Sequence, residues 1–555
     1  MLKLSPLCLA ALLLLQLPLA AVHAAPVAAV VDQALAARID ALVAPYYKPG
    51  QPGATLIVVK NGKTLLRKAY GMADVEHQVA MRPEATLRLG SITKQFTAVA
   101  IMMLADEGKL ATTDPITKFL PDYPTQGKVI TIEHLLTHTS GIVSYTGKPD
   151  FRTQSLRDVT VPQMIDYFKN DPIEFTPGTK HEYNNSGYFL LGAIIEKLSG
   201  QSYAKFVEQR IFIPLGMTHT AYEGHERAVV LRAAGHEQTP AGFGPSQPLS
   251  MSQPYAAGSL VSTVDDLAKW DAAISAGTLL KPASWKQAFT PYILANGTST
   301  GYAYGWAVGK LRGSQAVSHG GGINGFSTYA VRLPAEKVYV ALLTNSDSGM
   351  PAPSLVARQA AAVAIGKPFP EYKAIVLGTA ALDAFDGSYK VDEKSSRVVR
   401  REGDRLLMQR TGRGAVELIP FSPDNFFVKE STDTFTFHRN AQGQVDQVTL
   451  HADDADIVFP RTGAAPAPRV SVTLGQAALD TFVGRYELKP GFVLALTRDG
   501  EQLFGQATGQ PRLLLTPVSR TTFYVKQIDG EIRFDAGNAQ LTLLQGVRTV
   551  VAKRL

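Results

Sequence analysis

Two pairs of short apolar runs predict two β-hairpins that lie far apart in the chain. Residues 54–60 and 63–70 flank Asn-Gly at 61–62, a dipeptide that supplies the two positive φ angles of a type I′ turn. Residues 326–333 and 338–344 form a second pair around Pro-Ala-Glu. We therefore expect one antiparallel sheet that is built from both ends of a single domain.

The chain between these hairpins has helical periodicity instead. Apolar side chains recur three and four residues apart before Gly108 and again before Gly200, with Lys197 in the last predicted turn of the second segment. Such spacing places the apolar residues on one face of an α-helix. We therefore expect an α+β fold in which an antiparallel sheet is flanked by helices.

The last third of the chain changes to short alternating strands, and this pattern occurs twice. Segment 381–389 matches 478–486 at an offset of 97 residues, and further landmarks keep that offset. A Pro- and Ala-rich linker at 462–469 separates the copies. Short strands in this number are typical of a small antiparallel barrel or sandwich, and we assign a β-barrel to residues 377–462 and another to residues 474–555.

The first 24 residues have the composition of a secretory signal peptide. A short positive start precedes a Leu- and Ala-rich stretch that ends in Val-His-Ala at 22–24. We predict cleavage of residues 1–24, a first folded domain at residues 25–366, and a secreted or periplasmic location. No later run is apolar enough to span a membrane. The single cysteine, Cys8, lies in this leader, so the mature chain has no disulfide and no thiolate nucleophile.

Charge and histidine spacing exclude further classes of function. The net charge is +7, but basic residues are interspersed with acidic ones and form no block of the kind that binds nucleic acid. His134 and His138 are four residues apart, but the Glu of His-Glu-x-x-His is missing and no third ligand is apparent. We expect no nucleic-acid partner, no metal and no cofactor, and a capped, partly buried role for this pair.

Ser91-x-x-Lys94 is a candidate for nucleophilic chemistry. Residues three apart share one face of a helix, so Lys94 can reach the Ser91 hydroxyl near a helix N-terminus that favours negative charge. The pattern alone is weak, because Ser202 begins a second Ser-x-x-Lys that is explained as a helix N-cap. Ser299, within Gly-x-Ser-x-Gly, is a rival nucleophile, but it precedes the glycine-rich segment 318–326 and lies in a polar run, unlike a hydrolase elbow.

Two polar segments accompany Ser91 in the chain. One is PGTKHEYNNSGY at 177–188, which contains Tyr183 and Asn185 just ahead of a predicted helix. Taken alone, it is explained as well by a polar turn. The other is SHGGGINGF at 318–326, which lacks the Gly-Lys-Ser/Thr ending of a phosphate-binding loop and continues into a predicted strand.

In chain order, these segments resemble the three motifs of the serine β-lactamase and penicillin-binding DD-peptidase superfamily, in the branch with class C β-lactamases, D-aminopeptidases and esterases. The matching positions are Ser91-x-x-Lys94, Tyr183-x-Asn185 and His319-Gly-Gly. The resemblance covers roughly residues 30–365, and the two C-terminal repeats are similar to the pair of β-barrels in D-aminopeptidase.

The resemblance implies an acyl-enzyme mechanism. Ser91 would attack an acyl carbonyl, while Lys94 and Tyr183 would share the proton transfers, with either of them as the base. Asn185 would bind the substrate amide and hold Lys94 in place. The remaining binding and oxyanion positions would be His319, Gly321 and Gly322, the amides of Ser91 and Gly322 forming the oxyanion hole.

His319 stands where the lactamase motif has a lysine that helps to bind the substrate carboxylate. A histidine is mostly neutral at pH 7, so we expect substrates without that anion. We predict a hydrolase of small amides or peptides, chiefly those with D-amino acids; a carboxylesterase and a class C-like β-lactamase are alternatives. An aminopeptidase would need an anion for the substrate ammonium, for which the Asp529-Gly530 hairpin tip is a candidate.

Two interpretations from other classes remain open. A penicillin-binding sensor would acylate once without turnover, and an acyltransferase would pass the acyl group to an amine or alcohol. In each case the partner is a small molecule or a short peptide. A homo-oligomer is also left open.

Overall fold

The computed structural model describes residues 27–555 apart from residues 149, 225–228, 394, 453–454, 468, 490–491, 509, 511 and 547. The predicted signal peptide, with Cys8, lies outside the described residues. Within the described part of the chain, no helix is both long and apolar enough to cross a lipid bilayer.

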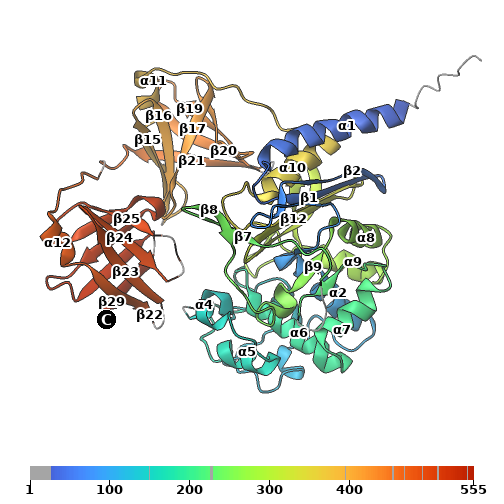
Figure 1. Ribbon diagram of the computed structural model, residues 1–555. Coiled ribbons are helices and arrows are strands. Elements are labelled where there is room, and N and C mark those ends of the chain that lie inside the picture. Colours follow the sequence, from blue (N-terminus) through green and yellow to red (C-terminus); the bar gives the residue numbers. More distant parts are fainter. Residues whose placement is uncertain are drawn as a thin grey trace, which may run out of the picture.

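A six-stranded antiparallel sheet forms the centre of the first domain, in the order β10-β11-β12-β13-β1-β2 (Figure 1). Both predicted hairpins belong to it, and pairing of β1 with β13 joins the two ends of the domain. Asn61 and Gly62 have φ angles of 51° and 73°, as the predicted turn requires. The strands are β1 (Ala54–Lys60), β2 (Lys63–Tyr70), β10 (Ala307–Leu311), β11 (Ser314–Ile323), β12 (Phe326–Leu333) and β13 (Val338–Thr344).

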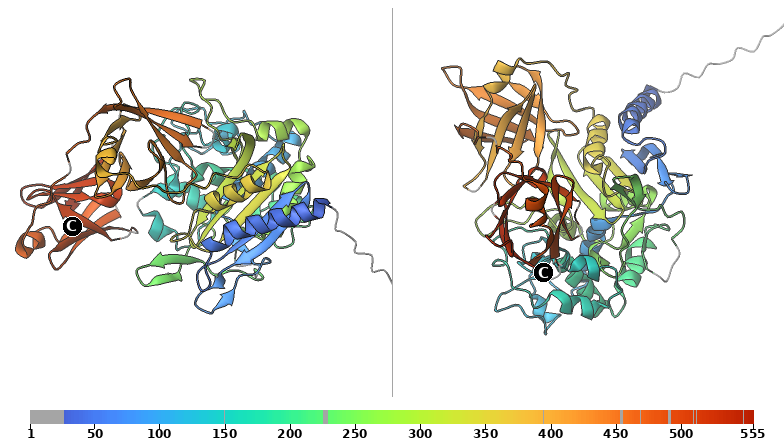
Figure 2. Two further views of the ribbon diagram at one scale, coloured as in Figure 1. Left: turned by 90° about the horizontal axis from the view of Figure 1, so that it is seen from above. Right: turned by 60° about the vertical axis from the view of Figure 1, so that its left-hand side comes forward.

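Helices cover both faces of this sheet. α1 (Val27–Val43) and α10 (Pro353–Ala364) pack together over the face that carries Leu56 and Val58 (Figure 2). Ile57 points to the opposite face, as the two-residue period of a strand requires. There it joins the core of the helical part of the domain.

The centre of that helical part is α2 (Thr93–Asp106), whose first twelve residues are all buried. It contacts α6 (Asn185–Ser199), which ends at Gly200 in the left-handed conformation. The other helices of this domain are α3 (Ile132–Leu136), α4 (Phe151–Gln154), α5 (Val161–Phe168), α7 (Tyr203–Val207), α8 (Val264–Ser275) and α9 (Pro282–Ala288). The short strands are β3 (Met72–Asp74), β4 (Val79–Ala80), β5 (Leu87–Arg88), β6 (Ala221–Tyr222), β7 (His236–Thr239), β8 (Gly242–Pro245) and β9 (Leu260–Ser262).

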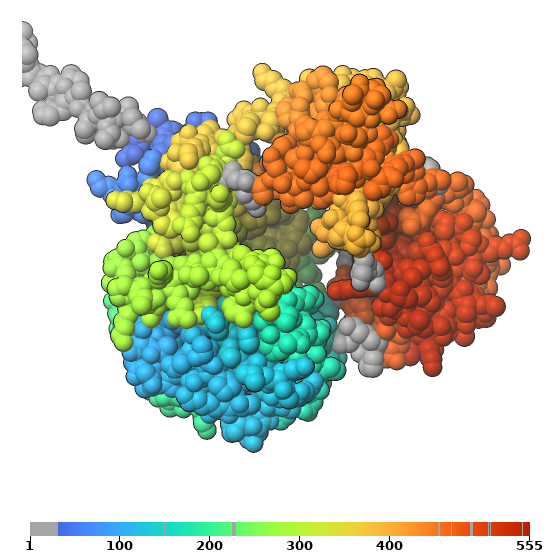
Figure 3. All heavy atoms as spheres, turned by 180° about the vertical axis from the view of Figure 1, so that it is seen from behind, coloured from blue at the N-terminus to red at the C-terminus, as the bar shows by residue number. Residues whose placement is uncertain are grey.

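Two closed antiparallel barrels follow, so the predicted fold class is confirmed. The first consists of β14 (Gly387–Lys390), β15 (Ser396–Glu402), β16 (Arg405–Arg410), β17 (Ala415–Ser422), β18 (Asn425–Phe427), β19 (Thr434–Arg439), β20 (Val445–Ala452) and β21 (Ala455–Gly463). The second consists of β22 (Gly484–Lys489), β23 (Phe492–Asp499), β24 (Gln502–Ala507), β25 (Leu513–Pro517), β26 (Thr522–Val525), β27 (Gly530–Phe534), β28 (Gln540–Gln545) and β29 (Arg548–Arg554). Each has its own apolar core, and the two form rounded lobes beside the first domain (Figure 3).

The internal repeat extends to individual contacts. Each barrel is preceded by a short helix, α11 (Thr379–Asp383) or α12 (Gln476–Asp480). Arg401 pairs with Asp383 in the first copy, and Arg498 pairs with Asp480 at the equivalent place in the second. Because side-chain pairs are kept as well as strands, the two barrels are copies of one unit.

The barrels also contact each other, and Asp529 takes part in this contact. Its Oδ2 accepts a hydrogen bond from the Gly412 amide of the first barrel at 3.2 Å, and its Oδ1 accepts one from the Tyr524 hydroxyl at 3.1 Å. Arg469 lies 3.5 Å away as a counter-ion. The expectation that Asp529 serves a substrate ammonium is therefore wrong, because the carboxylate joins the two barrels.

Candidate active site

Ser91 and Lys94 meet at the start of the central helix. Ser91 lies on a short 3-10 turn, Gly90–Ile92, which leads directly into α2. The Lys94 side chain is completely buried, and its Nζ lies 3.1 Å from Ser91 Oγ. Nζ also donates to Oδ1 of Asn185 at 2.8 Å and to the carbonyl oxygen of Ala257 at 2.9 Å. Three oxygen atoms therefore fix the amine beside the Ser91 hydroxyl.

The environment of Lys94 favours the neutral amine. Burial lowers the pKa of Lys94 well below its ordinary value of 10.5, because an ammonium loses its hydration inside the domain. The three oxygen neighbours are a hydroxyl, an amide and a backbone carbonyl, so none supplies a full negative charge. The ring centroids of Tyr183 and Tyr188 lie 4.8 and 5.4 Å from Nζ. These rings stabilise an ammonium, but less strongly than a carboxylate at the same place would.

Asn185 is positioned by the start of α6. The preceding residue, Asn184, is the N-cap, and its Oδ1 accepts a hydrogen bond from the Gly187 amide at 2.8 Å. The side-chain amide of Asn185 donates to Thr146 Oγ1 at 3.1 Å while its oxygen faces Lys94. These two partners fix which way the Asn185 amide group points.

Tyr183 lies two residues earlier, with 40% of its surface exposed. Burial of its hydroxyl raises the pKa of Tyr183 above the ordinary value of 10, and a hydrogen bond with Ser91 lowers it only in part. The phenol therefore keeps its proton at neutral pH, next to the serine oxygen.

His138 holds the Tyr183 segment in place, a role that the sequence did not indicate. Its carbonyl oxygen accepts from the Glu182 amide at 2.9 Å, and its Nδ1 accepts from the Asn184 amide at 3.1 Å. Its ring centroid lies 4.2 Å from that of Tyr183. His138 is buried and has a φ angle of 59°, which is uncommon outside glycine. It therefore fixes the residues on both sides of Tyr183.

The other member of the histidine pair has a local role. His134 forms a capping box with Thr131 at the start of α3: its Nδ1 accepts from the Thr131 amide, and its own amide donates to Thr131 Oγ1, both at 3.2 Å. Among the described residues, no group of three or more His, Cys, Asp or Glu side chains could hold a metal ion.

His319 lies on β11, buried behind the serine. Its Nδ1 is 2.6 Å from the carbonyl oxygen of Gly320, and its Nε2 is 2.8 Å from the Tyr302 hydroxyl. Because a carbonyl oxygen only accepts, Nδ1 carries the proton and Nε2 accepts from Tyr302. Burial, followed by the nearby Lys94, lowers the pKa of His319 to about 4. At pH 7 the neutral fraction of the His319 ring is therefore larger than that of an ordinary histidine.

Gly321 and Gly322, farther along β11, have different surroundings. A Cβ atom on Gly321 would lie 1.9 Å from the Leu89 carbonyl oxygen and 2.4 Å from Thr328 Oγ1, so only glycine lets β11 approach the Ser91 turn. A Cβ atom on Gly322 would meet nothing within 4 Å. Gly322 faces open space beside Ser91, whereas Gly321 packs against the domain.

A cavity of about 140 Å³ opens in front of Ser91. Of the predicted site residues, those that line it are Ser91, Asn185 and Gly322. The structure thus places the serine, one amide side chain and one glycine on the cavity wall. Lys94, Tyr183, His319 and Gly321 lie off this wall.

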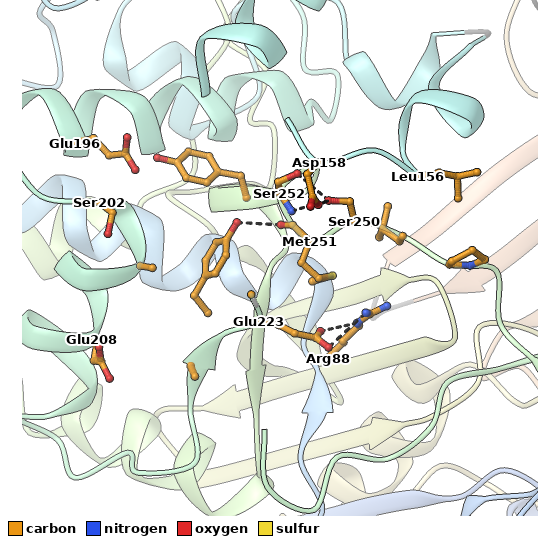
Figure 4. Close-up of a pocket in the computed structure, with 17 residues that line it drawn as sticks. Arg88, Leu156, Asp158, Glu196, Ser202, Glu208, Glu223, Ser250, Met251 and Ser252 are labelled. Carbon is orange, nitrogen blue, oxygen red and sulfur yellow. Dashed lines mark hydrogen bonds and ion pairs between the residues drawn. The ribbon is translucent and has the colours of Figure 1, made fainter. Parts of the chain in front are cut away.

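A larger cavity, of about 800 Å³, lies next to it (Figure 4). Its lining includes several acidic side chains, and Glu223 pairs there with Arg88 at 2.6 Å. Leu249 lines both cavities, so the segment around it forms part of the wall between them.

The two rival serines serve local structure. Ser202 is the N-cap of α7 and accepts a hydrogen bond from the Lys205 amide at 3.3 Å, as predicted. Ser299 is exposed in a loop, where its hydroxyl accepts from the Gly301 amide at 3.3 Å. Neither lies on the wall of the cavity that Ser91 lines.

Comparison with known proteins identifies the family. The family model described as Beta-lactamase matches residues 31–365. Penicillin-binding protein 4* of Bacillus subtilis is 28% identical over 407 residues, which cover 68% of this chain and 88% of that protein.

Two solved structures extend the comparison. An octameric penicillin-binding protein homologue from Pyrococcus abyssi is 27% identical with a TM-score of 0.55, covering 78% of this chain and 98% of its own. A D-stereospecific amidohydrolase from Streptomyces sp. is 28% identical with a TM-score of 0.50, covering 56% of this chain and 94% of its own. The family match spans more than half of the chain, which therefore belongs to the beta-lactamase family and is a serine hydrolase.

Proposed function

We propose that the protein hydrolyses small amides and short peptides that contain D-amino acids, through an acyl-enzyme on Ser91. The observation that carries this proposal is the contact of Ser91 Oγ with a buried lysine amine, at 3.1 Å. The likeness to a D-stereospecific amidohydrolase supports the choice of substrate.

Lys94 is the base in this proposal. A neutral amine has two hydrogens and one lone pair. Asn185 Oδ1 and the Ala257 carbonyl are acceptors and take the two hydrogens. The lone pair is left facing Ser91 Oγ, so Lys94 takes the serine proton while Oγ bonds to the acyl carbon.

Tyr183 is the acid for the leaving group. It keeps its proton because burial raises its pKa, and it lies beside Ser91, close to where the leaving nitrogen departs. It donates that proton to the amine as the C–N bond breaks, and the proton on Lys94 then restores the phenol. In the second half of the reaction, Lys94 takes a proton from water as the water oxygen bonds to the acyl carbon. The bond from this carbon to Ser91 Oγ then breaks, and Lys94 returns the proton to Oγ.

The developing oxyanion is stabilised by backbone amides of Ser91 and Gly322. A Cβ atom on Gly90 would lie 3.0 Å from the Gly322 nitrogen, which shows how closely β11 approaches the serine turn. Two backbone N–H groups near one oxygen supply the stabilisation that acyl transfer requires.

A carboxylesterase is the second candidate. None of the described residues that line the cavity in front of Ser91 is charged, and a simple ester needs neither a carboxylate nor an ammonium for binding. An ester leaving group also depends less on protonation by Tyr183.

The test compares Ser91→Ala with Ser202→Ala, the matched serine of the second Ser-x-x-Lys. The first variant should lose turnover of D-aminoacyl p-nitroanilides and p-nitrophenyl esters, and should form no acyl adduct in intact-mass spectrometry. The second should keep both and lose only about 1 kcal/mol of stability, because it removes an N-cap. Unchanged turnover in Ser91→Ala would refute the proposal.

A further inference from the structure

The cavity in front of Ser91 has an apolar wall. Its larger side chains are Tyr145, Phe151, Leu249, Pro254 and Ile323. The polar groups on the wall are hydroxyls and amides, and none of the lining residues within the described part of the chain is Asp, Glu, Lys, Arg or His. An acyl group that enters this cavity therefore meets no formal charge on the described residues that surround it.

Three charged side chains in this part of the domain do not line the cavity. Lys94 lies behind the serine, in surroundings that favour its neutral form. Lys148, just beyond the turn that carries Tyr145, is paired with Asp171 at 2.6 Å. Glu223 lines the larger cavity, where it pairs with Arg88 at 2.6 Å (Figure 4).

The candidate counter-ion from the barrels already has other partners. Asp529, the candidate at a hairpin tip, joins the two barrels instead. The first barrel meets the catalytic domain around Arg312 and Phe369. Arg312 lies in the turn before β11, whereas Gly322 lies near the end of that strand, roughly 30 Å away at ~3.3 Å per residue.

The size of the cavity suits one side chain of the acyl group, and because the cavity is open on one side, the rest of the acyl group extends from its mouth. Its volume of about 140 Å³ is close to that of an engineered apolar cavity of about 150 Å³ that binds benzene. One phenyl or branched aliphatic side chain fills such a space. Burying an ammonium or a carboxylate there without a partner is unfavourable.

We infer that the acyl group is uncharged, with one aromatic or branched aliphatic side chain and no free ammonium or carboxylate beside the scissile carbonyl. This inference rests on the proposed function and narrows it. An N-acylated D-phenylalanyl or D-leucyl amide fits, so the enzyme cleaves blocked aminoacyl amides in preference to removing a free N-terminal residue.

The test compares N-acetyl-D-phenylalanine p-nitroanilide with D-phenylalanine p-nitroanilide on the full chain. An α-amino group titrates near pH 8, so the second substrate is mostly charged at about pH 6.5 and mostly neutral at about pH 9.5. The ratio of the two kcat/KM values cancels the pH dependence of the enzyme. At the lower pH, kcat/KM for the acetylated substrate should exceed that for the free amine by at least about tenfold, which corresponds to a cost of about 1.4 kcal/mol for binding the unpaired ammonium. At the higher pH, this ratio should be closer to one.

Two variants move a charge into the cavity. Phe151→Glu places a carboxylate on its wall, and Thr146→Asp does so with little change in volume. Each should lower the ratio about tenfold by pairing with the ammonium. The control is Thr153→Glu, which adds the same charge at an exposed position of the same helix and should leave the ratio unchanged.

A ratio near or below one at both pH values, with the acyl adduct still formed on Ser91, would overturn this inference alone. No acyl adduct with either anilide or with a p-nitrophenyl ester would instead refute the proposed function, and the inference with it.

Discussion

Lys94 Nζ and Asn185 Oδ1 lie 2.8 Å apart although 91 residues separate them in the chain. The partner of the buried amine is thus an amide oxygen and not a carboxylate. An amide accepts a hydrogen bond without adding the negative charge that would hold a proton on Lys94. An amide at this position is thus compatible with the role as a base that we propose for Lys94.

The substitution Asn185→Asp should reverse that choice. A carboxylate at the same distance stabilises the ammonium and raises the pKa of Lys94, since an opposite charge within about 4 Å favours the charged form. We expect kcat/KM at neutral pH to fall at least about tenfold, with the acid limb of the pH profile moved to higher pH. The measurement is kcat/KM for a p-nitroanilide across that range.

The control for this variant is Asn440→Asp, in an exposed turn of the first barrel where the side-chain oxygen accepts from the Gln442 and Gln444 amides. Asp keeps those acceptors, so activity should be unchanged. A pH profile for Asn185→Asp that coincides with the wild-type profile would contradict the assignment of Lys94 as the base.

His138 should act as a positioning residue for Tyr183. His138→Ala leaves the Asn184 amide without its acceptor and removes the ring that packs on Tyr183. We expect kcat to fall by about one to two orders of magnitude with KM nearly unchanged, because the proposed proton donor, Tyr183, is displaced but the cavity wall is kept. His138→Asn should recover part of kcat, since Asn tolerates a positive φ angle and can accept from the amide.

The matched control is His134→Ala on the neighbouring helix. It removes a capping contact with Thr131, so it should cost stability and leave kcat alone. Equal losses of kcat in the His134 and His138 variants, or a change in KM alone, would show that His138 supports only the fold.

Gly321 and Gly322 should respond differently to the same added methyl group. Gly321→Ala brings Cβ against the backbone at Leu89, so we expect about 1–3 kcal/mol of destabilisation. Gly322→Ala has room for its Cβ and should melt like the wild type, but with lower kcat/KM because the methyl group narrows the approach to Ser91. Thermal unfolding and kinetics of both variants separate the two effects, and similar melting temperatures would contradict this account of Gly321.

The sequence predicts the parts of the fold that depend on local pattern. The two hairpins follow from alternation and from Asn61-Gly62, and the barrels follow from a repeat with constant offset. The reach of Lys94 to Ser91 follows from a spacing of three residues, although Ser91 lies on a 3-10 turn just before the α-helix.

The remaining features depend on contacts between distant segments. The role of His138 depends on residues that follow it by more than forty positions, so helical spacing to His134 gave no sign of it. The need for glycine at 321 arises from the carbonyl oxygen of Leu89, which lies between β5 and the turn that carries Ser91. The sequence makes Asp529 a candidate for binding a substrate ammonium because it stands at a predicted hairpin tip, whereas packing of the two barrels gives its carboxylate other partners.

The last prediction concerns stability against acid. Burial lowers the pKa of His319 to about 4 and that of His138 well below 6.5. In the unfolded chain, these two histidines bind protons near pH 6.5, whereas in the folded domain they stay neutral at that pH. Stability is therefore greatest above about pH 6.5 and falls as the pH drops from about 6.5 toward 4. Each such histidine adds up to about 1.4 kcal/mol per pH unit to the slope.

Tryptophan fluorescence isolates the domain concerned, because all three tryptophans, Trp270, Trp285 and Trp306, are buried in it and the barrels have none. His319→Gln should flatten the dependence of the unfolding free energy on pH by one proton. His219→Gln, at an exposed position, should leave it unchanged. A wild-type unfolding free energy that stays constant between about pH 7 and pH 5 would contradict this prediction. It would mean that the buried histidines, including His319 between Tyr302 and Gly320, bind protons in the folded state as readily as in the unfolded chain.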